Sequence, residues 1–229
     1  MLSSLLSLQA QRQRLLKKSV PGALQDFYQV AFPEPRSSIT DITFAVLDVE
    51  TTGLDMQNDQ LLSIGVVDIQ QLGVLLGSAE HTLVQSDKAL PEITTVIHGI
   101  TDDALEQGEV PQVALANLLS RLAGKVLIAH HASIELGQLN KLCQQFYQQD
   151  FLIPVIDTQT LAYRQLSRGG QTVKQGDLRL FNLRKRYGLP DYKAHHALYD
   201  AMATAELFLA LVGELYPARD CQLKDLLEN

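Results

Sequence analysis

The amino-acid sequence predicts an α/β fold in which helices flank a mixed five-stranded sheet, preceded along the chain by an N-terminal helical arm. The chain has 229 residues, of which 46% are hydrophobic, enough for one sizeable buried core. Residues 42–48, 61–69 and 74–84 show strand patterns, with a turn at Gly73, as in an antiparallel meander. From residue 111 onward, helical patterns alternate with short apolar strands, which is typical of a sheet with helices on its faces.

Residues 1–40 are predicted to form the helical arm. Leucines alternate with basic and glutamine residues at a roughly helical period, and Pro33 and Pro35 then mark a break. The arm is expected to pack on the main domain, because its leucines would otherwise expose apolar surface. The main domain is expected over residues 41–215, followed by a C-terminal tail at 216–229.

The second half is predicted to alternate helices and strands. Pro111 suits the first turn of a helix. Ser133 and Asp157 are residue types that cap helices, and Asp157 is expected to cap the segment that follows it. Gly188 and Pro190 stop a helix at its C-terminal end. The expected elements are helices at 111–122, 133–148, 158–166, 178–187 and 197–215, and strands at 125–129 and 155–156.

Composition argues against several classes of protein. Cys143 and Cys221 lie in segments with helical patterns and show no CxxC spacing, so neither a zinc site nor a disulfide framework is expected. No run approaches the roughly 18 apolar residues of a membrane-spanning helix, and residues 1–20 lack the order of a signal peptide. We therefore expect a cytoplasmic protein without membrane contact.

The charge is unevenly distributed. The formal net charge of −7 argues against nonspecific coating of nucleic acid. Eight basic and two acidic residues lie between Arg164 and Lys193, so this segment carries +6 and the remainder −13. Such a basic band suits a phosphodiester substrate, although a solvated loop and helix face explains it equally well.

The most informative segment is the strand that ends in Asp48-Val-Glu50-Thr-Thr-Gly53. Successive side chains of a strand alternate between faces, so Asp48 and Glu50 project from the same face. Two unpaired carboxylates this close repel each other, and Mg²⁺ or Mn²⁺, which prefers oxygen ligands, neutralises them. The segment therefore predicts a metal site.

Two further segments supply candidate residues. In His195-His196-Ala-Leu-Tyr-Asp200, five helical positions would leave His195 and Asp200 about 140° apart, so His195 is expected in the loop before the helix. Its ring can then lean over a site that Asp200 reaches from the first helical turns. Glu135 lies near the start of the helix at 133–148, where it is either a ligand or one of the acidic residues common in first turns.

Together these segments resemble the DEDDh family of 3′-to-5′ exonucleases, which includes the proofreading epsilon subunit of the bacterial replicative polymerase. The resemblance runs from about Thr43 to Leu211 and rests mainly on the first motif and on the His195-to-Asp200 motif with its alanine-rich continuation. It implies a ribonuclease H-like fold and hydrolysis of nucleic acid, DNA favoured, from the 3′ end to nucleoside 5′-monophosphates.

The resemblance also implies roles for individual residues. Asp48, Glu50 and Asp200 match the metal-binding carboxylates, and Glu135 stands where the family has a further one. His195 matches the general base, and the ordinary pKa of histidine near 6.5 suits that role. The implied cofactor is a pair of Mg²⁺ or Mn²⁺ ions, which activate water and stabilise the leaving oxygen. The residues expected at the substrate are Thr51, Thr52, Gly53, Leu54 and His98.

Glu135 is a departure from the family pattern, which has Asp at this motif. One added methylene moves a carboxylate by roughly 1.5 Å, comparable to displacements that cost about a hundredfold in rate. Glu135 is therefore compatible with a normal enzyme, with an altered metal preference or with a weakened catalyst. Two alternative functions stay open: an exonuclease for RNA or oligoribonucleotides, and a nucleic-acid-binding module that has lost turnover. The expected partners are nucleic acid with a free 3′ end and a DNA polymerase or another replication or repair protein.

Overall fold

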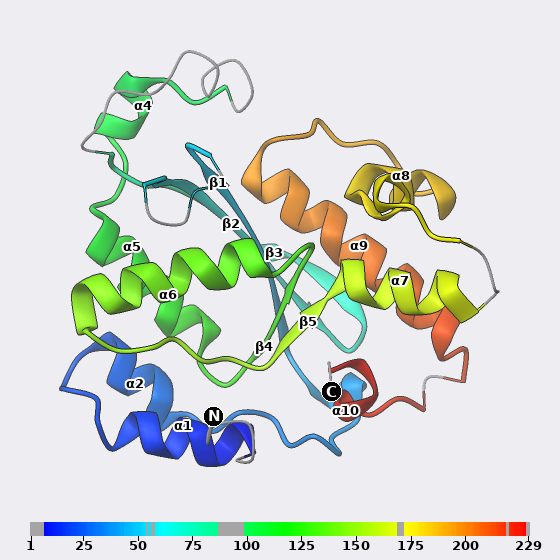
Figure 1. The fold of residues 1–229 in the computed structure, drawn as a ribbon, viewed down its shortest axis with the longest axis horizontal. Coiled ribbons are helices and arrows are strands. Elements are labelled where there is room, and N and C mark those ends of the chain that lie inside the picture. Colours follow the sequence, from blue (N-terminus) through cyan, green and yellow to red (C-terminus); the bar gives the residue numbers. More distant parts are fainter. Residues whose placement is uncertain are drawn as a thin grey trace.

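A five-stranded sheet forms the centre of the computed structural model (Figure 1). The structure describes residues 7–53, 55, 58–86, 99–168, 172–218 and 220–227. The strands are β1 (Phe44–Thr51), β2 (Leu61–Gln70), β3 (Gly73–Leu83), β4 (Val126–Ala129) and β5 (Val155–Asp157). Their order is β3-β2-β1-β4-β5. β1, β2 and β3 pair antiparallel, whereas β4 pairs parallel with β1 and with β5, which confirms the predicted mixed sheet.

Helices cover both faces of the sheet (Figure 1). The helices are α1 (Leu8–Leu16), α2 (Ala23–Gln29), α4 (Asp102–Glu106), α5 (Pro111–Leu122), α6 (Ser133–Tyr147), α7 (Thr158–Arg168), α8 (Leu180–Arg186), α9 (Ala197–Leu215) and α10 (Leu223–Leu226), with short 3-10 helices η2 (Ile39–Asp41) and η3 (Gln175–Leu178). The side chains of β1 alternate as a strand requires. Phe44 and Val46 face α9, and Ala45 and Leu47 face α5 and α6. No helix in the described part of the chain is long and apolar enough to cross a membrane.

The N-terminal arm forms two helices that pack on the main domain. Leu8, Leu15 and Leu16 pack against the core on the side of α5 and α6. This confirms the expectation that the arm packs these leucines on the main domain. The Tyr28 hydroxyl donates to the Asp150 carbonyl at 2.8 Å and accepts from the Leu152 amide at 2.9 Å. The C-terminal segment joins this end of the molecule, because the Leu223 amide donates to the Ser37 carbonyl. The division of the chain at residues 40 and 215 stays a prediction.

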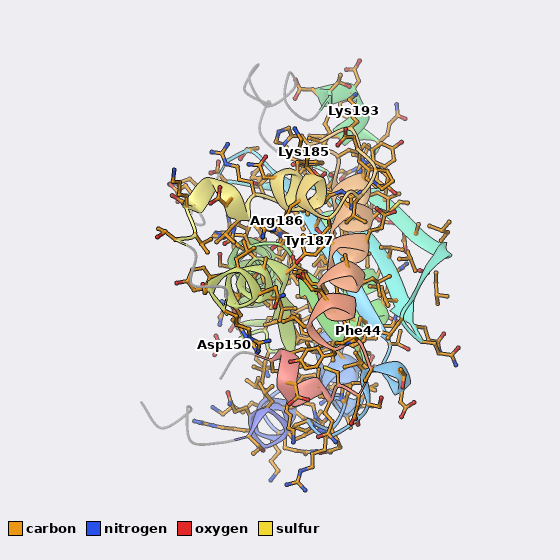
Figure 2. All side chains as sticks on the ribbon, turned by 90° about the vertical axis from the view of Figure 1, so that its right-hand side faces the viewer. Phe44, Asp150, Lys185, Arg186, Tyr187 and Lys193 are labelled. Atoms are coloured by element: carbon orange, nitrogen blue, oxygen red, sulfur yellow. The ribbon has the colours of Figure 1, made fainter. Side chains whose placement is uncertain are left out.

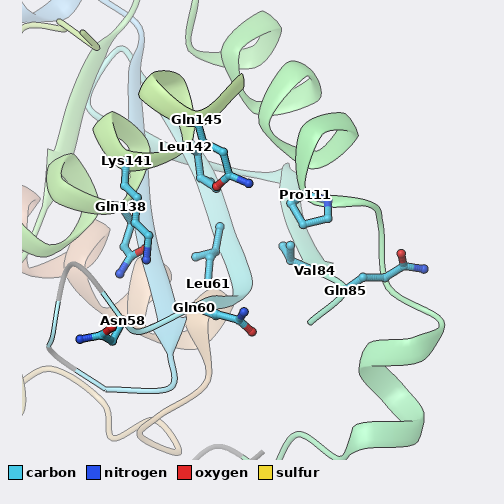
Figure 3. A pocket seen from close by; sticks show the side chains of 10 residues that line it. All are labelled: Asn58, Gln60, Leu61, Val84, Gln85, Pro111, Gln138, Lys141, Leu142 and Gln145. Atoms are coloured by element: carbon cyan, nitrogen blue, oxygen red, sulfur yellow. The ribbon is translucent and has the colours of Figure 1, made fainter. Parts of the chain in front are cut away.

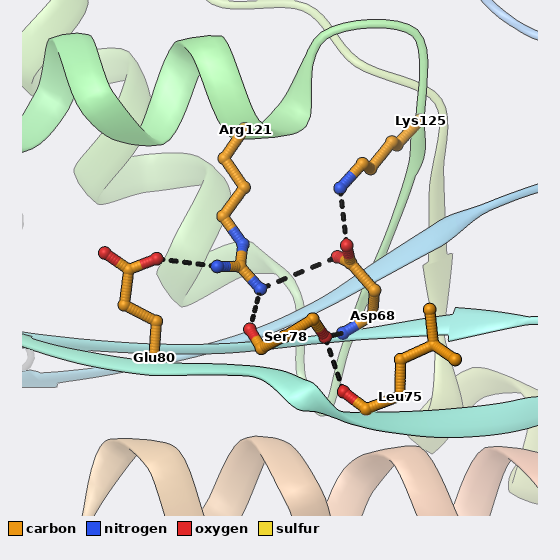
Figure 4. Close-up of polar contacts among 6 residues, drawn as sticks. All are labelled: Asp68, Leu75, Ser78, Glu80, Arg121 and Lys125. Atoms are coloured by element: carbon orange, nitrogen blue, oxygen red, sulfur yellow. Dashed lines mark hydrogen bonds and ion pairs between the residues drawn. The ribbon is translucent and has the colours of Figure 1, made fainter.

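A polar network fastens α5 to the sheet (Figure 4). The Lys125 ammonium lies 2.7 Å from the carboxylate of Asp68, and the Arg121 guanidinium lies 3.8 Å from it. Arg121 also pairs with Glu80 on β3 at 2.6 Å and donates to the Ser78 carbonyl. These contacts join α5 and the residue before β4 to β2 and β3. They therefore hold the hairpin formed by β2 and β3 against α5.

The predicted cap at the start of α6 is wrong. Ala132 occupies the cap position, and no side-chain hydrogen bond from that residue caps the helix. Instead, the carboxylate of Asp157, at the end of β5, accepts from the His131 and Ala132 amides at 3.0 and 3.1 Å. The same carboxylate accepts from the Gln159 amide at 2.8 Å, which confirms the cap predicted for the segment after β5. Parallel pairing of β4 and β5 brings Asp157 to both helix starts, a contact that no local pattern reveals.

Candidate active site

Three of the predicted carboxylates meet at the end of β1. Ligand oxygens of Asp48, Glu50 and Asp200 lie within 4.8 Å of one another. Asp48 and Glu50 project from the face of β1 that α9 covers, as the alternation along the strand predicts. Asp200 lies in the first turn of α9. We call these three residues the acidic triad.

A glycine on β2 lets α9 come close enough to complete the triad. Gly65 pairs with Asp48 on the neighbouring strand. A Cβ added at Gly65 would lie 2.1 Å from the carbonyl carbon of Ala197 and 2.2 Å from the amide nitrogen of Leu198. The start of α9 therefore lies directly on the backbone of β2. The buried alanines of α9, among them Ala197 and Ala201, allow this close approach from the helix side, and Gly65 allows it from the sheet.

The two carboxylate oxygens of Asp200 have different environments. Oδ2 accepts the His195 amide at 2.9 Å, whereas Oδ1 is buried without a hydrogen-bond partner among the described residues. Burial raises the pKa of Asp200 to about 6, and the charge of Glu50 adds to this effect. Because buried polar atoms are normally paired, Oδ1 is suited to a ligand that lies between the carboxylates.

Glu135 lies in the first turn of α6 and is 2% exposed. Burial, together with the charges of Asp157 and Glu50, raises its pKa to about 8. Its Oε2 atom is a second buried carboxylate oxygen without a partner in the described part of the chain. Burial raises the pKa of Asp48, and among its charged neighbours Glu135 has the largest effect, so Glu135 lies beside the acidic triad.

The arrangement fits a hard divalent cation. Four carboxylates share one partly buried neighbourhood, and their burial and mutual repulsion raise the pKa values of Asp48, Glu135 and Asp200. A cation with oxygen ligands removes both penalties and occupies the two orphan oxygens of Asp200 and Glu135. The donor set is suited to Mg²⁺ or Mn²⁺, and Glu135 joins it from α6.

His195 lies in the loop before α9, as predicted, because the helix begins at Ala197. Its side chain is exposed, and its charge lowers the pKa of Asp200, so the ring lies near that carboxylate. The backbone of His195 has a φ of 64°, in the left-handed region that residues other than glycine rarely adopt. This conformation turns the chain so that the His195 amide can reach Asp200.

The described part of the predicted substrate segment consists of Thr51, the last residue of β1, a bend at Thr52, and Gly53. The Thr51 hydroxyl donates to the Gly53 carbonyl at 2.6 Å, and the Thr52 hydroxyl donates to the carboxylate of Asp59 at 2.7 Å. A Cβ at Gly53 would lie 2.6 Å from that carboxylate, so a larger residue here would have to displace the Asp59 side chain. Lys141 of α6 donates to the Asp59 carbonyl at 2.5 Å and holds the turn from outside. The other two predicted substrate residues, Leu54 and His98, lie outside the described residues.

The comparisons with known proteins agree with this geometry. Residues 45–208 match the family model RNase_T, described as exonuclease. The chain belongs to this exonuclease family. The predicted resemblance and the prediction of a nuclease are therefore confirmed at the level of the family.

Individual members of the exonuclease family show the extent of the similarity. The chain is 33% identical over 176 residues to the PolC-type DNA polymerase III of Thermotoga petrophila, covering 77% of this chain and 12% of that protein. It is 30% identical over 172 residues to the DNA polymerase III subunit epsilon of Treponema pallidum, covering 75% and 77%. The structure of E. coli exonuclease I in complex with a dT13 oligonucleotide has the same fold, with a TM-score of 0.62 and 20% identity over 77% of this chain and 42% of that one. The chain thus spans only a small part of its PolC-type relatives.

Three residues that shape this candidate site were not predicted from the sequence to do so. They are Gly65, Asp59 and Asp157, the last of which was predicted to cap only the segment after β5. Gly65 had a usable signal, because an isolated glycine inside an apolar strand often marks a close backbone approach. Asp59 accepts from the Thr52 hydroxyl and the Asp55 amide within its own loop. Asp157 accepts from the His131 and Ala132 amides, which only the fold brings to it, so this role has no local sequence signature.

A separate cleft of about 250 Å³ lies on the α6 side of the sheet (Figure 3). Its floor is apolar and its rim carries amides and Lys141. The lining residues are Asn58, Gln60, Leu61, Val84, Gln85, Pro111, Gln138, Lys141, Leu142 and Gln145. Leu61, Val84 and Leu142 belong to the core on the α5 and α6 face, whereas Asp48 and Glu50 face α9. The cleft is therefore distinct from the acidic triad.

Proposed function

We propose that the chain hydrolyses nucleic acid from its 3′ end to nucleoside 5′-monophosphates, with two Mg²⁺ or Mn²⁺ ions as cofactor. The observation that carries this proposal is the meeting of Asp48, Glu50 and Asp200 from two distant elements within 4.8 Å. Two buried carboxylate oxygens without partners among the described residues, on Asp200 and Glu135, support a cation-binding role for the same neighbourhood.

Each side chain has a defined task in this proposal. Asp48, Glu50, Asp200 and Glu135 hold the ions, which when bound acidify a water molecule and stabilise charge on the leaving 3′-oxygen. His195, exposed beside Asp200, accepts the proton of the attacking water at a ring nitrogen. Oδ2 of Asp200 keeps the His195 amide in place while Oδ1 is available for the ion.

The turn at residues 51–53 is proposed to receive the terminal nucleotide. It follows directly after Glu50, so a nucleotide held there places its phosphate beside the acidic triad. The hydrogen bonds of Thr51 and Thr52 and the link from Lys141 through Asp59 fix the shape of the turn. A fixed turn loses little conformational entropy when it binds a ligand. Leu54 and His98, which lie outside the described residues, are also proposed to bind the substrate.

Exposed basic residues between Lys174 and Lys193 suit a phosphodiester chain. They are Lys174, Arg179, Lys185, Arg186 and Lys193, which we call the basic surface. Figure 2 shows Lys185 and Arg186 on α8 and Lys193 nearby, before α9. Arg184 belongs to the interior instead, because it donates to the Ala203 carbonyl at 2.6 Å and pairs with Glu206 at 2.7 Å. Only part of the charge counted from the sequence therefore faces solvent.

DNA is the favoured substrate, and a DNA polymerase or another replication or repair protein is the favoured partner. The relatives from Thermotoga and Treponema are DNA polymerase III proteins, and E. coli exonuclease I was solved with a DNA oligonucleotide. We propose a cytoplasmic location, since Cys143 and Cys221 are both buried and unpaired.

The test is digestion of 3′-labelled and 5′-labelled single strands with Mg²⁺ or Mn²⁺. The wild type is expected to release labelled mononucleotide from the 3′ label first, and matched RNA is expected to be cut more slowly. Asp48→Ala is expected to abolish cleavage, whereas Glu135→Asp, which matches the usual family residue, retains or raises it. Equal activity in all three proteins would contradict the assignment of the site.

A second candidate function is nucleic-acid binding without turnover. The observation in its favour is Glu135, whose buried carboxyl has a pKa of about 8 and is therefore protonated at neutral pH until a cation displaces the proton. A purified wild type that binds oligonucleotide, yet releases no mononucleotide with either metal, would favour this candidate.

A further inference from the structure

A histidine on β3 belongs to the same row of the sheet as the acidic triad. Asp48 pairs with Gly65, and Gly65 pairs with His81, so the three positions lie side by side on the face covered by α9. Gly65 has no side chain, and the start of α9 fills that space. His81 therefore meets α9 immediately beside its first turn.

The ring of His81 packs, in a tilted arrangement, against the ring of the residue that follows the proposed general base. Its centroid lies 4.3 Å from that of His196, with 31° between the planes. The His196 ring stacks on Tyr199, one helical turn further on, at 4.3 Å and 26°. We call these three residues the aromatic clamp. One ring comes from β3 and the others from the start of α9, so the clamp joins the helix start to the sheet.

The segment held by the clamp is strained. His195 has a φ of 64°, and a residue other than glycine stays in this region only when its surroundings hold it there. One restraint is the hydrogen bond from the His195 amide to Asp200 at 2.9 Å. The clamp supplies a second restraint at the next residue, His196. The two restraints act on consecutive residues and leave the His195 backbone little freedom.

We propose that His81 is a positioning residue, which holds His195 beside the acidic triad through the packing of its ring against His196. This inference rests on the proposed function, in which His195 accepts the proton of the attacking water. A packed ring pair shifts a local equilibrium by up to about tenfold. Without His81, a larger share of the molecules has the loop before α9 in conformations that do not hold His195 beside the acidic triad. The rate of the chemical step falls with the share of molecules that keep His195 in place.

The experiment compares three variants in the metal-dependent digestion assay. His81→Ala is expected to lower kcat severalfold, by up to about tenfold, with KM changed less than about twofold, since His81 acts on the loop and not on the substrate. His81→Phe keeps a ring without titratable nitrogens and is expected to restore kcat to within about threefold of wild type. The matched control is Thr82→Ala, the next residue of β3, whose side chain lies on the opposite face near Ile64 and Arg121. Thr82→Ala is expected to leave kcat unchanged.

Three results would overturn the inference: wild-type kcat in His81→Ala, a His81→Phe protein as slow as His81→Ala, or equal slowing by Thr82→Ala. If His81→Ala does not fold, Tyr199→Leu replaces it, because Tyr199 is 40% exposed and its removal takes away the other ring of the clamp. The same fall in kcat at constant KM is expected, and an unchanged kcat overturns the inference.

Failure of the nuclease proposal can be distinguished from failure of the inference about His81. A wild-type protein that releases no mononucleotide refutes the nuclease proposal, and the clamp is then judged by histidine ring signals in NMR spectra of the ¹⁵N-labelled protein. His81→Ala is expected to shift the signals of both His195 and His196. Unchanged signals in this variant would show that His81 does not hold the loop.

Discussion

Substituting Gly65 by Ala tests whether the close approach of α9 to β2 builds the site. The new Cβ would lie 2.1 Å from the carbonyl carbon of Ala197, and ordinary contact begins at 3.4 Å. The neighbouring atoms are backbone, so a rotamer change cannot make room. Either α9 or β2 must move by about 1.3 Å, and Asp200 moves relative to Asp48 by a similar distance.

The expected fall in activity follows from this displacement. A misplacement of about 1 Å in a catalytic arrangement costs about a hundredfold in rate, so Gly65→Ala is expected to lower kcat about a hundredfold or more. Forcing extra volume into packed structure also costs about 1–3 kcal/mol of stability. The fall in rate should exceed what the unfolded fraction explains, because most molecules of the variant remain folded.

The assay is metal-dependent release of mononucleotide, with urea denaturation of the same samples. Gly77→Ala is the matched control, since Gly77 lies on β3 with no atom within 4 Å of an added Cβ. This control is expected to keep wild-type activity. A Gly65→Ala protein with a rate within about threefold of wild type would refute the claim that this close approach positions Asp200.

Three further predictions concern charge. Burial raises the pKa of Glu135 from 4.5 to about 8, so the metal-free folded protein binds more protons than the unfolded chain and loses stability as the pH rises from about 4.5 to 8. Glu135→Gln should flatten that decline in urea denaturation with chelator, and an unchanged slope would count against it. Calorimetry should show that Mg²⁺ binds more tightly at pH 8 than at pH 6 and that binding releases protons. The reason is that the cation competes with protons on Glu135 and on Asp200, whose pKa is about 6. A Mg²⁺ affinity that does not depend on pH would contradict this prediction. Charge reversal of Lys185 and Arg186 should raise KM. It should also reduce the salt dependence of single-strand binding, the slope of log K against log salt concentration, by about 0.7 for each phosphate that the variant no longer neutralises. Arg36→Glu, at an exposed position elsewhere, should change neither quantity, and equal slopes in both variants would show that the basic surface does not contact the substrate.

The order and type of most elements could be predicted from the sequence, because local periodicity reports which residues are buried. The helices at Pro111–Leu122 and Ala197–Leu215 begin and end where predicted. β1 extends further than expected, to Thr51. The helices α4 and α10 were not predicted, since five and four residues are too short to show a period.

The side chains available for chemistry follow from the local sequence alone. Alternation along a strand places Asp48 and Glu50 on one face, and helical geometry puts His195 outside α9, whatever the rest of the chain does. How those groups meet, and how they are charged, depends on the packing of the whole chain. The position of Gly65 under α9, the reach of Asp157 to the start of α6 and the buried carboxyl of Glu135 join residues far apart in the sequence. Distances and desolvation arise from such packing, so no local pattern encodes them.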